Sequence, residues 1–143
     1  MLPKLAEVVA FRAMTAADVP FVMDTWSKCW RVSPWAGTIP NNRIHEIVRE
    51  TVAGLLSRGA RVEVACAKSD PDKILGYVCH EHLPESTVIH WTYVKDPYRQ
   101  MGLGTELIER NAPQGTRRYY THRTRDSAYF RGWRHAPEIA RRK

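Results

Sequence analysis

One loop in the sequence has the residue types and spacing of an anion-binding site. Arg99, Gly102 and Gly104 occur as Arg-x-x-Gly-x-Gly, after the β-branched and aromatic run Val88–Val94 and before an apolar helical face that includes Leu107. A glycine loop that opens a helix offers unpaired backbone N–H groups and the positive end of the helix dipole. The stretch therefore predicts a strand, a tight loop and a helix that together bind a phosphate group.

Several phosphate-binding loops contain closely spaced glycines, and the surrounding residues distinguish them. A Walker loop needs a lysine directly after its last glycine, but Thr105 follows Gly104 here. A dinucleotide-binding loop needs a third glycine, where Leu107 stands, and it follows the first strand of its unit, whereas this loop comes late in the chain. A plain turn, in which the glycines only allow a sharp change of direction, is the structural alternative.

The stretch Tyr93–Ile108 closely resembles the strand, loop and helix of the GNAT family, the GCN5-related N-acetyltransferases, whose loop motif is Arg/Gln-x-x-Gly-x-Gly/Ala. The resemblance implies an α/β (α+β) fold, with a central mixed, mainly antiparallel sheet of about five to six strands and about four helices. It also implies transfer of an acetyl group from acetyl-coenzyme A to an amine of unknown identity by direct attack. We expect a single domain over residues 1–143.

The resemblance also implies where coenzyme A binds. In that family the loop amides hold the pyrophosphate, and backbone N–H groups at the end of the central strand, where it splays from its neighbour, bind the pantetheine and the thioester. By position, ten residues of this chain are assigned to the coenzyme: Thr92, Tyr93, Val94, Arg99, Gln100, Met101, Gly102, Leu103, Gly104 and Thr105.

Acetyl transfer requires that the attacking amine lose a proton. The resembled family often places a carboxylate near the start of the central strand, but Val88 occupies that position here. His90 lies two residues later, on the same face of the strand, and histidine titrates near neutral pH, so His90 is the candidate base. A packed strand histidine is the structural alternative. Glu81, His82 and Glu63 are rival bases, and water alone is a further possibility.

The resemblance also implies a tyrosine in the fourth helix as the acid that protonates the leaving thiolate. Tyr129 lies in the predicted helix Asp126–Trp133, but it stands three residues before Gly132, where the family usually has four. Simple packing is the alternative role of Tyr129.

The remaining chemistry-bearing residues do not predict a metal site. The three cysteines lack metal-ligand spacing and are interpreted as buried reduced thiols. His80, His82 and His90 are more typical of structural strand histidines. The chain has 43% hydrophobic residues and neither a membrane span nor a signal peptide is recognisable, so we expect a globular cytoplasmic protein.

The formal charge of +7 is concentrated at the end of the chain. Residues 117–143 contain nine of the 22 Lys and Arg residues and two of the 15 acidic residues, so residues 1–116 are neutral. Such a segment suits a polyanion: the coenzyme phosphates, a nucleic acid or an acidic protein. Two alternative functions on the same fold therefore stay open, a nucleic-acid-binding or nucleic-acid-modifying protein of the phage Mom type and a non-catalytic regulator that binds coenzyme A.

The residue pattern predicts the elements that must position these groups. Thr15 and Asp18 predict a capping box for the first helix, and Asn41 or Asn42 caps the second, which ends at Gly59. Strands are predicted at Glu7–Arg12, Arg61–Ala67, Ile74–Leu83, Val88–Val94 and Arg117–His122, with a turn at Ser69–Lys73; the middle three form an antiparallel meander.

The chain departs from the resembled family at its end. The family usually continues past the fourth helix into two closing strands, whereas this chain ends ten residues after Trp133. At most a short strand is expected there. An exposed sheet edge favours covering by another chain, so a homodimer is a weak expectation.

Overall fold

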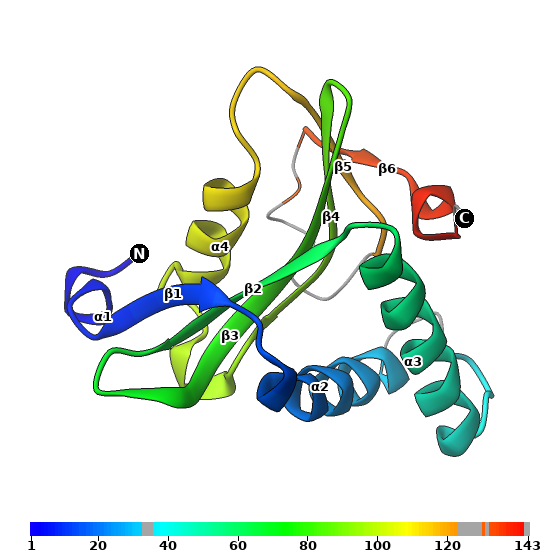
Figure 1. The fold of residues 1–143 in the computed structure, drawn as a ribbon, viewed down its shortest axis with the longest axis horizontal. Coiled ribbons are helices and arrows are strands. Elements are labelled where there is room, and N and C mark those ends of the chain that lie inside the picture. The colour runs from blue at the N-terminus through cyan, green and yellow to red at the C-terminus, as the bar shows by residue number, and fades with distance from the viewer. Residues whose placement is uncertain (33–35, 123–129, 131, 142–143) are drawn as a thin grey trace.

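A computed structural model describes residues 1–32, 36–122, 130 and 132–141. These residues form one six-stranded sheet in the order β1-β2-β3-β4-β5-β6, with helices on both of its faces (Figure 1). The strands are β1 (Val9–Ala13), β2 (Arg61–Ala67), β3 (Asp70–Leu83), β4 (Ser86–Val94), β5 (Arg117–Tyr120) and β6 (Arg134–His135). The helices are α1 (Pro3–Ala6), α2 (Val19–Arg31), α3 (Asn41–Ser57) and α4 (Leu103–Asn111), with short 3-10 helices η1 (Ala16–Asp18), η2 (Asp96–Tyr98) and η4 (Pro137–Arg141).

The sheet is mixed. Strands β1 to β4 pair antiparallel, whereas β5 runs parallel to β4 and β6 runs parallel to β5. The predicted meander of β2, β3 and β4 is confirmed: β2 pairs antiparallel with β3, β3 pairs antiparallel with β4, and short turns join them. The predicted mainly antiparallel α/β architecture is likewise confirmed.

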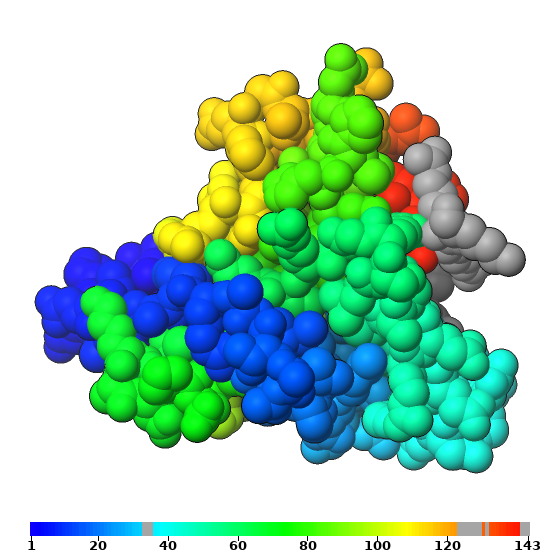
Figure 2. Space-filling view, in the orientation of Figure 1, coloured from blue at the N-terminus to red at the C-terminus, as the bar shows by residue number. Residues whose placement is uncertain are grey.

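Each face of the sheet has its own core. On one face, α2 and α3 pack side by side over β2, β3 and β4 (Figure 2), and Trp26, Ile44 and Tyr77 are among the fully buried side chains of this core. On the other face, α4 covers the sheet with Leu103 and Leu107. Successive residues of a strand point to opposite faces, so one central strand serves both cores.

Several predicted boundaries differ from the structure. Strand β1 runs from Val9 to Ala13, not from Glu7 to Arg12. Strand β3 begins at Asp70, because the turn lies at residues 68–69 rather than 69–73. Asn41 is the first residue of α3 and does not cap it; the Pro40 carbonyl accepts the first helical hydrogen bonds, from Arg43 and Ile44 N–H.

The start of α2 agrees with the sequence. A capping box joins Thr15 and Asp18, and the Thr15 N–H donates to Asp18 Oδ2 at 2.7 Å. The same carboxylate forms an ion pair with Arg12 of β1 and is 6% exposed. The box therefore also ties the helix to the first strand.

The end of the chain adds a sixth strand to the sheet. Predicted strand 117–122 ends at Tyr120, and the predicted helix 126–133 lies mostly outside the described residues. Strand β6 is a two-residue strand, and the Ala136 N–H that follows it donates to the Tyr120 carbonyl at 2.9 Å. Within the described residues, no helix is long and apolar enough to cross a membrane.

Candidate functional site

Strand β4 carries a bulge in the middle of the sheet. Cys79 of β3 lies opposite Trp91, but the next residue, His80, lies opposite Ile89, so β4 has one extra residue at His90. Bulges of this kind re-aim side chains and increase the local twist. Here both His90 and Trp91 face α2 and α3: Trp91 belongs to that core, and His90 bonds to a carboxylate held at the end of α3.

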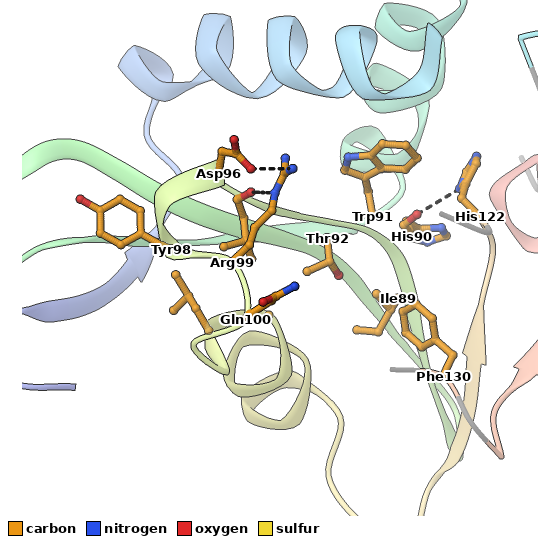
Figure 3. A pocket seen from close by; sticks show the side chains of 13 residues that line it. Ile89, His90, Trp91, Thr92, Asp96, Tyr98, Arg99, Gln100, His122 and Phe130 are labelled. Atoms are coloured by element: carbon orange, nitrogen blue, oxygen red, sulfur yellow. Dashed lines mark hydrogen bonds and ion pairs between the residues drawn. The ribbon is translucent and has the colours of Figure 1, made fainter. Parts of the chain in front are cut away.

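Strands β4 and β5 pair only over the first half of β4. The parallel ladder runs from Ser86 to Ile89, and the Thr121 N–H donates to the Ile89 carbonyl at 3.1 Å. Beyond this bond, among the described residues, β4 is paired only with β3. At residues 91–94, the edge of β4 that faces away from β3 borders a cavity of about 380 Å³, which extends to the start of α4 (Figure 3).

Two polar atoms in the wall of this cavity are buried without a hydrogen-bond partner among the described residues. They are Trp91 Nε1 and Thr92 Oγ1. Figure 3 shows Trp91 on the side of α2 and Thr92 on the side of α4. Buried polar groups that lack a partner are uncommon in folded proteins, so both atoms are candidates for contact with a ligand.

The glycine loop is held in shape from the end of β4. Arg99 Nε donates to the Val94 carbonyl at 2.9 Å, and its Nη1 pairs with Asp96 at 3.1 Å. Gln100 and Gly102 have φ values of +64° and +81°, so the chain turns sharply before α4, whose N-cap is Gly102. The loop thus brings unpaired helix N–H groups beside the cavity.

Six of the ten predicted coenzyme residues line the cavity: Thr92, Val94, Arg99, Gln100, Leu103 and Gly104. The other four do not. The Tyr93 ring packs against Tyr77 on the α2 face at 5.4 Å, and Thr105 is exposed. Met101 and Gly102 lie against the N-terminal residues, with Leu2 N–H donating to the Met101 carbonyl.

A chain of buried polar groups lies behind the cavity. His90 Nε2 is 2.9 Å from Glu81 Oε1, which also accepts a hydrogen bond from Arg58 at 2.9 Å. His90 Nδ1 is 3.1 Å from the Thr121 hydroxyl, which is 2.8 Å from Nδ1 of His122. His90 and His122 both line the cavity, so the chain connects the cavity to a buried carboxylate.

The His90 ring is fully buried and both of its nitrogens are engaged. Burial lowers the pKa of His90 below the ordinary value for histidine, and the Glu81 carboxylate opposes this shift. The ring is therefore neutral near pH 7. His90 and Val88 face the same side of the sheet as predicted, and His90 is one of the residues that line the cavity. Its bond to Thr121 also links it to His122, another lining residue.

The other candidate bases lie elsewhere. Glu63 is on the α4 face, where it bonds Arg110 and Asn111. His82 is exposed, beside His80. Tyr129 lies outside the described residues. Among the described residues, no group of His, Cys, Asp or Glu is arranged to hold a metal ion.

Six residues of the cavity wall are not among the predicted site residues: Ile89, Trp91, Asp96, Tyr98, His122 and Phe130. The alternation of one strand does not reveal a bulge, so no sequence signal distinguishes Trp91 from an ordinary strand residue. Of the nine basic residues in segment 117–143, the side chains of Arg117, Arg118 and Arg134 are described. The Arg118 guanidinium donates to the Ala112 carbonyl and lies 5.2 Å from the Trp133 ring. Residues 123–129, 131 and 142–143 of the segment lie outside the described residues.

Comparison with known proteins agrees with this geometry. The model of the Acetyltransferase (GNAT) family matches residues 20–132. The chain belongs to the GNAT acetyltransferase family. The match covers most of this GNAT chain and includes α2, the bulged strand and the glycine loop. No curated protein sequence matches the chain.

Solved GNAT structures share the fold at low sequence identity. A Pyrococcus furiosus protein assigned as an acetyl transferase has 15% identity, a TM-score of 0.63 and coverage of 90% of this chain and 94% of its own. A GNAT acetyltransferase from Brucella melitensis in complex with acetyl-CoA has 16% identity, a TM-score of 0.56 and coverage of 85% and 80%. The PaiA N-acetyltransferase of Thermoplasma acidophilum, in complex with coenzyme A, has 16% identity and a TM-score of 0.50; the match covers 70% of this chain and 67% of PaiA.

Proposed function

We propose that the protein is an N-acetyltransferase that uses acetyl-coenzyme A as its donor. The observation that carries the proposal is one continuous cavity, which joins the glycine loop at the start of α4 to the open edge of β4. Membership of the GNAT family supports the reaction class, and a GNAT protein of similar fold was solved with acetyl-CoA. Acetyl-coenzyme A would supply the acetyl group as an activated thioester.

The residues of the cavity fit such a donor. Backbone N–H groups between Gln100 and Thr105, at the positive end of α4, are suited to a pyrophosphate. The open edge of β4 at residues 91–94 offers backbone hydrogen bonds to an amide-bearing arm. Thr92 Oγ1 and Trp91 Nε1 are buried polar atoms without a partner in the described structure, and a polar ligand would satisfy them.

We further propose that His90 and Glu81 position the groups that accept the proton lost by the amine. Both nitrogens of His90 are already bonded, to Glu81 and Thr121, so in this proposal the ring acts on the amine through its neighbours. It holds the Thr121 hydroxyl and, through it, His122 at the cavity wall. His90 and Glu81 are therefore positioning residues in this proposal. The role of Tyr129 as the acid toward the thiolate rests on the family resemblance.

Binding of acetyl-coenzyme A tests the proposal. A ligand at about 100 times its dissociation constant stabilises a protein by about 2.7 kcal/mol, which raises the unfolding midpoint by roughly 5–11 °C for a chain of this size. Gly104→Glu places a negative charge at the start of α4, inside the cavity. It should abolish the rise.

Gly54→Glu is the matched control, because Gly54 is also a helical glycine and a side chain there meets open space. It should keep the full rise. Circular dichroism checks that both variants unfold cooperatively. A wild-type midpoint that does not move with saturating acetyl-coenzyme A would refute the proposed function.

A further inference from the structure

The N-terminal residues lie against the glycine loop, on the side away from the cavity. The Leu2 N–H donates to the Met101 carbonyl at 2.9 Å. A Cβ on Gly102 would lie 2.8 Å from Met1 Cα, so the two main chains are in direct contact, and Figure 1 shows the N-terminal end beside α4. Gln100 of the same loop lines the cavity. The loop is therefore held between the cavity and the N-terminal residues.

These residues are anchored to the core of the protein. Residues 1–6, here called the N-terminal strap, include the short helix α1, and Leu5 of that helix is buried. Leu5 packs in the core on the α4 face together with Leu103 of α4 and Val9 of β1. A helix of four residues is not stable by itself, so burial of Leu5 keeps the strap in place. The strap therefore joins the first strand to the loop before α4.

The bond from the strap fixes the direction of one peptide group in the loop. The Met101–Gly102 peptide is trans, and in a trans peptide the carbonyl and the N–H point in opposite directions. The Met101 carbonyl points to Leu2, so the Gly102 N–H points away from the strap, toward the side on which the cavity lies. Gly102 is the N-cap of α4, where backbone N–H groups have no acceptor within the helix. The strap thus turns a helix-terminal donor toward the cavity.

Gly102 does not determine this direction by itself. Its φ is +81°, and glycine adopts positive and negative φ about equally, so it tolerates both orientations of the peptide group before it. In the reversed orientation the Met101 carbonyl oxygen would face the cavity, where it would repel a phosphate. The hydrogen bond from Leu2 favours the orientation that presents the N–H.

We propose that the N-terminal strap positions the glycine loop for the pyrophosphate of the coenzyme, through the hydrogen bond from the Leu2 N–H to the Met101 carbonyl. This inference rests on the proposed function. Leu2 is a positioning residue, because it acts through the Met101 peptide group and does not contact the coenzyme. The donor is a main-chain N–H, so the effect depends on the backbone of Leu2 and not on its side chain.

Leu2→Pro removes this donor and keeps the local backbone. Leu2 has φ −61° and ψ 139°, which suit a proline that precedes another proline, here Pro3. The Leu2 side chain is exposed, and Leu2→Ala shortens it but keeps the N–H, so Leu2→Ala is the matched control. In calorimetric titration with coenzyme A, Leu2→Pro should raise the Kd about three- to tenfold, the effect of one hydrogen bond. Leu2→Ala should stay within about twofold of the wild type.

The direction of the peptide group is measured separately by NMR. Met101–Gly102 is the only Met-Gly pair in the sequence, so carbonyl-¹³C methionine and ¹⁵N glycine together isolate the Gly102 amide. Its proton resonance should move downfield when coenzyme A is added to the wild type or to Leu2→Ala, because a hydrogen bond to phosphate forms. The shift should be smaller in Leu2→Pro. Without ligand, the unfolding midpoints of both variants should stay within about 2 °C of the wild type, which separates positioning from a general loss of structure.

The outcomes separate this inference from the function on which it rests. Equal Kd values in Leu2→Pro and Leu2→Ala would overturn the inference, and so would a Gly102 amide that responds equally in both. Tighter binding by Leu2→Pro would also overturn it, because a strap that obstructs the coenzyme would have that effect. Only an absent thermal shift of the wild type with acetyl-coenzyme A refutes the proposed function itself.

Discussion

Replacing Glu81 with glutamine tests the energetics of the buried polar chain. Glu81 Oε1 lies 2.9 Å from Arg58 Nη2 and 2.9 Å from His90 Nε2, and the three side chains are 7%, 15% and 0% exposed. Glutamine keeps the shape and one acceptor oxygen but removes the charge that faces the Arg58 guanidinium. Removing one partner of a buried ion pair costs about 3–5 kcal/mol. Because Arg58 keeps its hydrogen bond to the Ile139 carbonyl, we expect a loss near 3 kcal/mol.

Urea unfolding at pH 7 measures this loss directly. In thermal unfolding, a change of about 3 kcal/mol corresponds to a fall in the midpoint temperature of roughly 6–12 °C. Glu7→Gln removes the same charge from an exposed position and should change stability by no more than about 0.5 kcal/mol. An exposed ion pair contributes less than about 1 kcal/mol to the free energy of unfolding. A loss of that size for Glu81→Gln would refute the reasoning from burial.

The same variant has a consequence for His90. Burial lowers the pKa of His90, and the Glu81 carboxylate raises it in opposition. Removing the carboxylate leaves the effect of burial, so the pKa of His90 should fall further and its protonation should move to lower pH. Titration of the ring by NMR checks the direction. A pKa that stays constant or rises would contradict the geometry of the pair.

Two further predictions concern the frame around the site. A Cβ on Gly76 would lie 2.6 Å from the Tyr93 carbonyl oxygen, so Gly76→Ala must push β3 from β4 and should cost about 1–3 kcal/mol in urea unfolding. Gly54→Ala, in open space on a helix, should be neutral or stabilise by up to about 1 kcal/mol, and equal effects of the two substitutions would refute the steric argument. Hydrogen bonding and charge from Arg12 hold the pKa of Asp18 well below its ordinary value of 3.8. The ion pair therefore stabilises the folded protein fully above about pH 4, and this stabilisation is lost as the pH falls toward the pKa of Asp18 in the folded protein. The stability advantage of the wild type over Asp18→Asn should therefore shrink in unfolding curves taken below about pH 4, and an advantage that grows there would contradict the assigned shift.

Local features of the structure were accessible from sequence because they depend on neighbouring residues. The spacing of Arg99, Gly102 and Gly104 predicts the loop, and Gly102 does adopt the left-handed conformation that a sharp turn requires. Strand β2 has the predicted bounds, and the capping box at Thr15 is present. Smaller errors arose where backbone pairing extended a strand through polar residues, as at Asp70 in β3.

The walls of the cavity were only partly accessible from sequence. The period of a strand places His90 on the face of Val88, but it does not reveal the bulge that turns Trp91 to that face as well. Histidine at position 90 was a reasonable base from its chemistry. Its burial between Glu81 and Thr121 depends on β3 and on the residue after β5, and the same bonds connect it to His122, which also lines the cavity.

The sequence by itself determined the family, the glycine loop at the start of α4 and the order of most strands, because each is encoded in a short run of residues. Tertiary structure decided where β4 and β5 part, which side chains bond His90 and how Trp26 of α2 stacks on Trp91 of the bulged strand. These features depend on the register between strands and on packing between helices distant in sequence. Hydrophobic periodicity records which face of an element is buried, but it does not record which partner lies against that face.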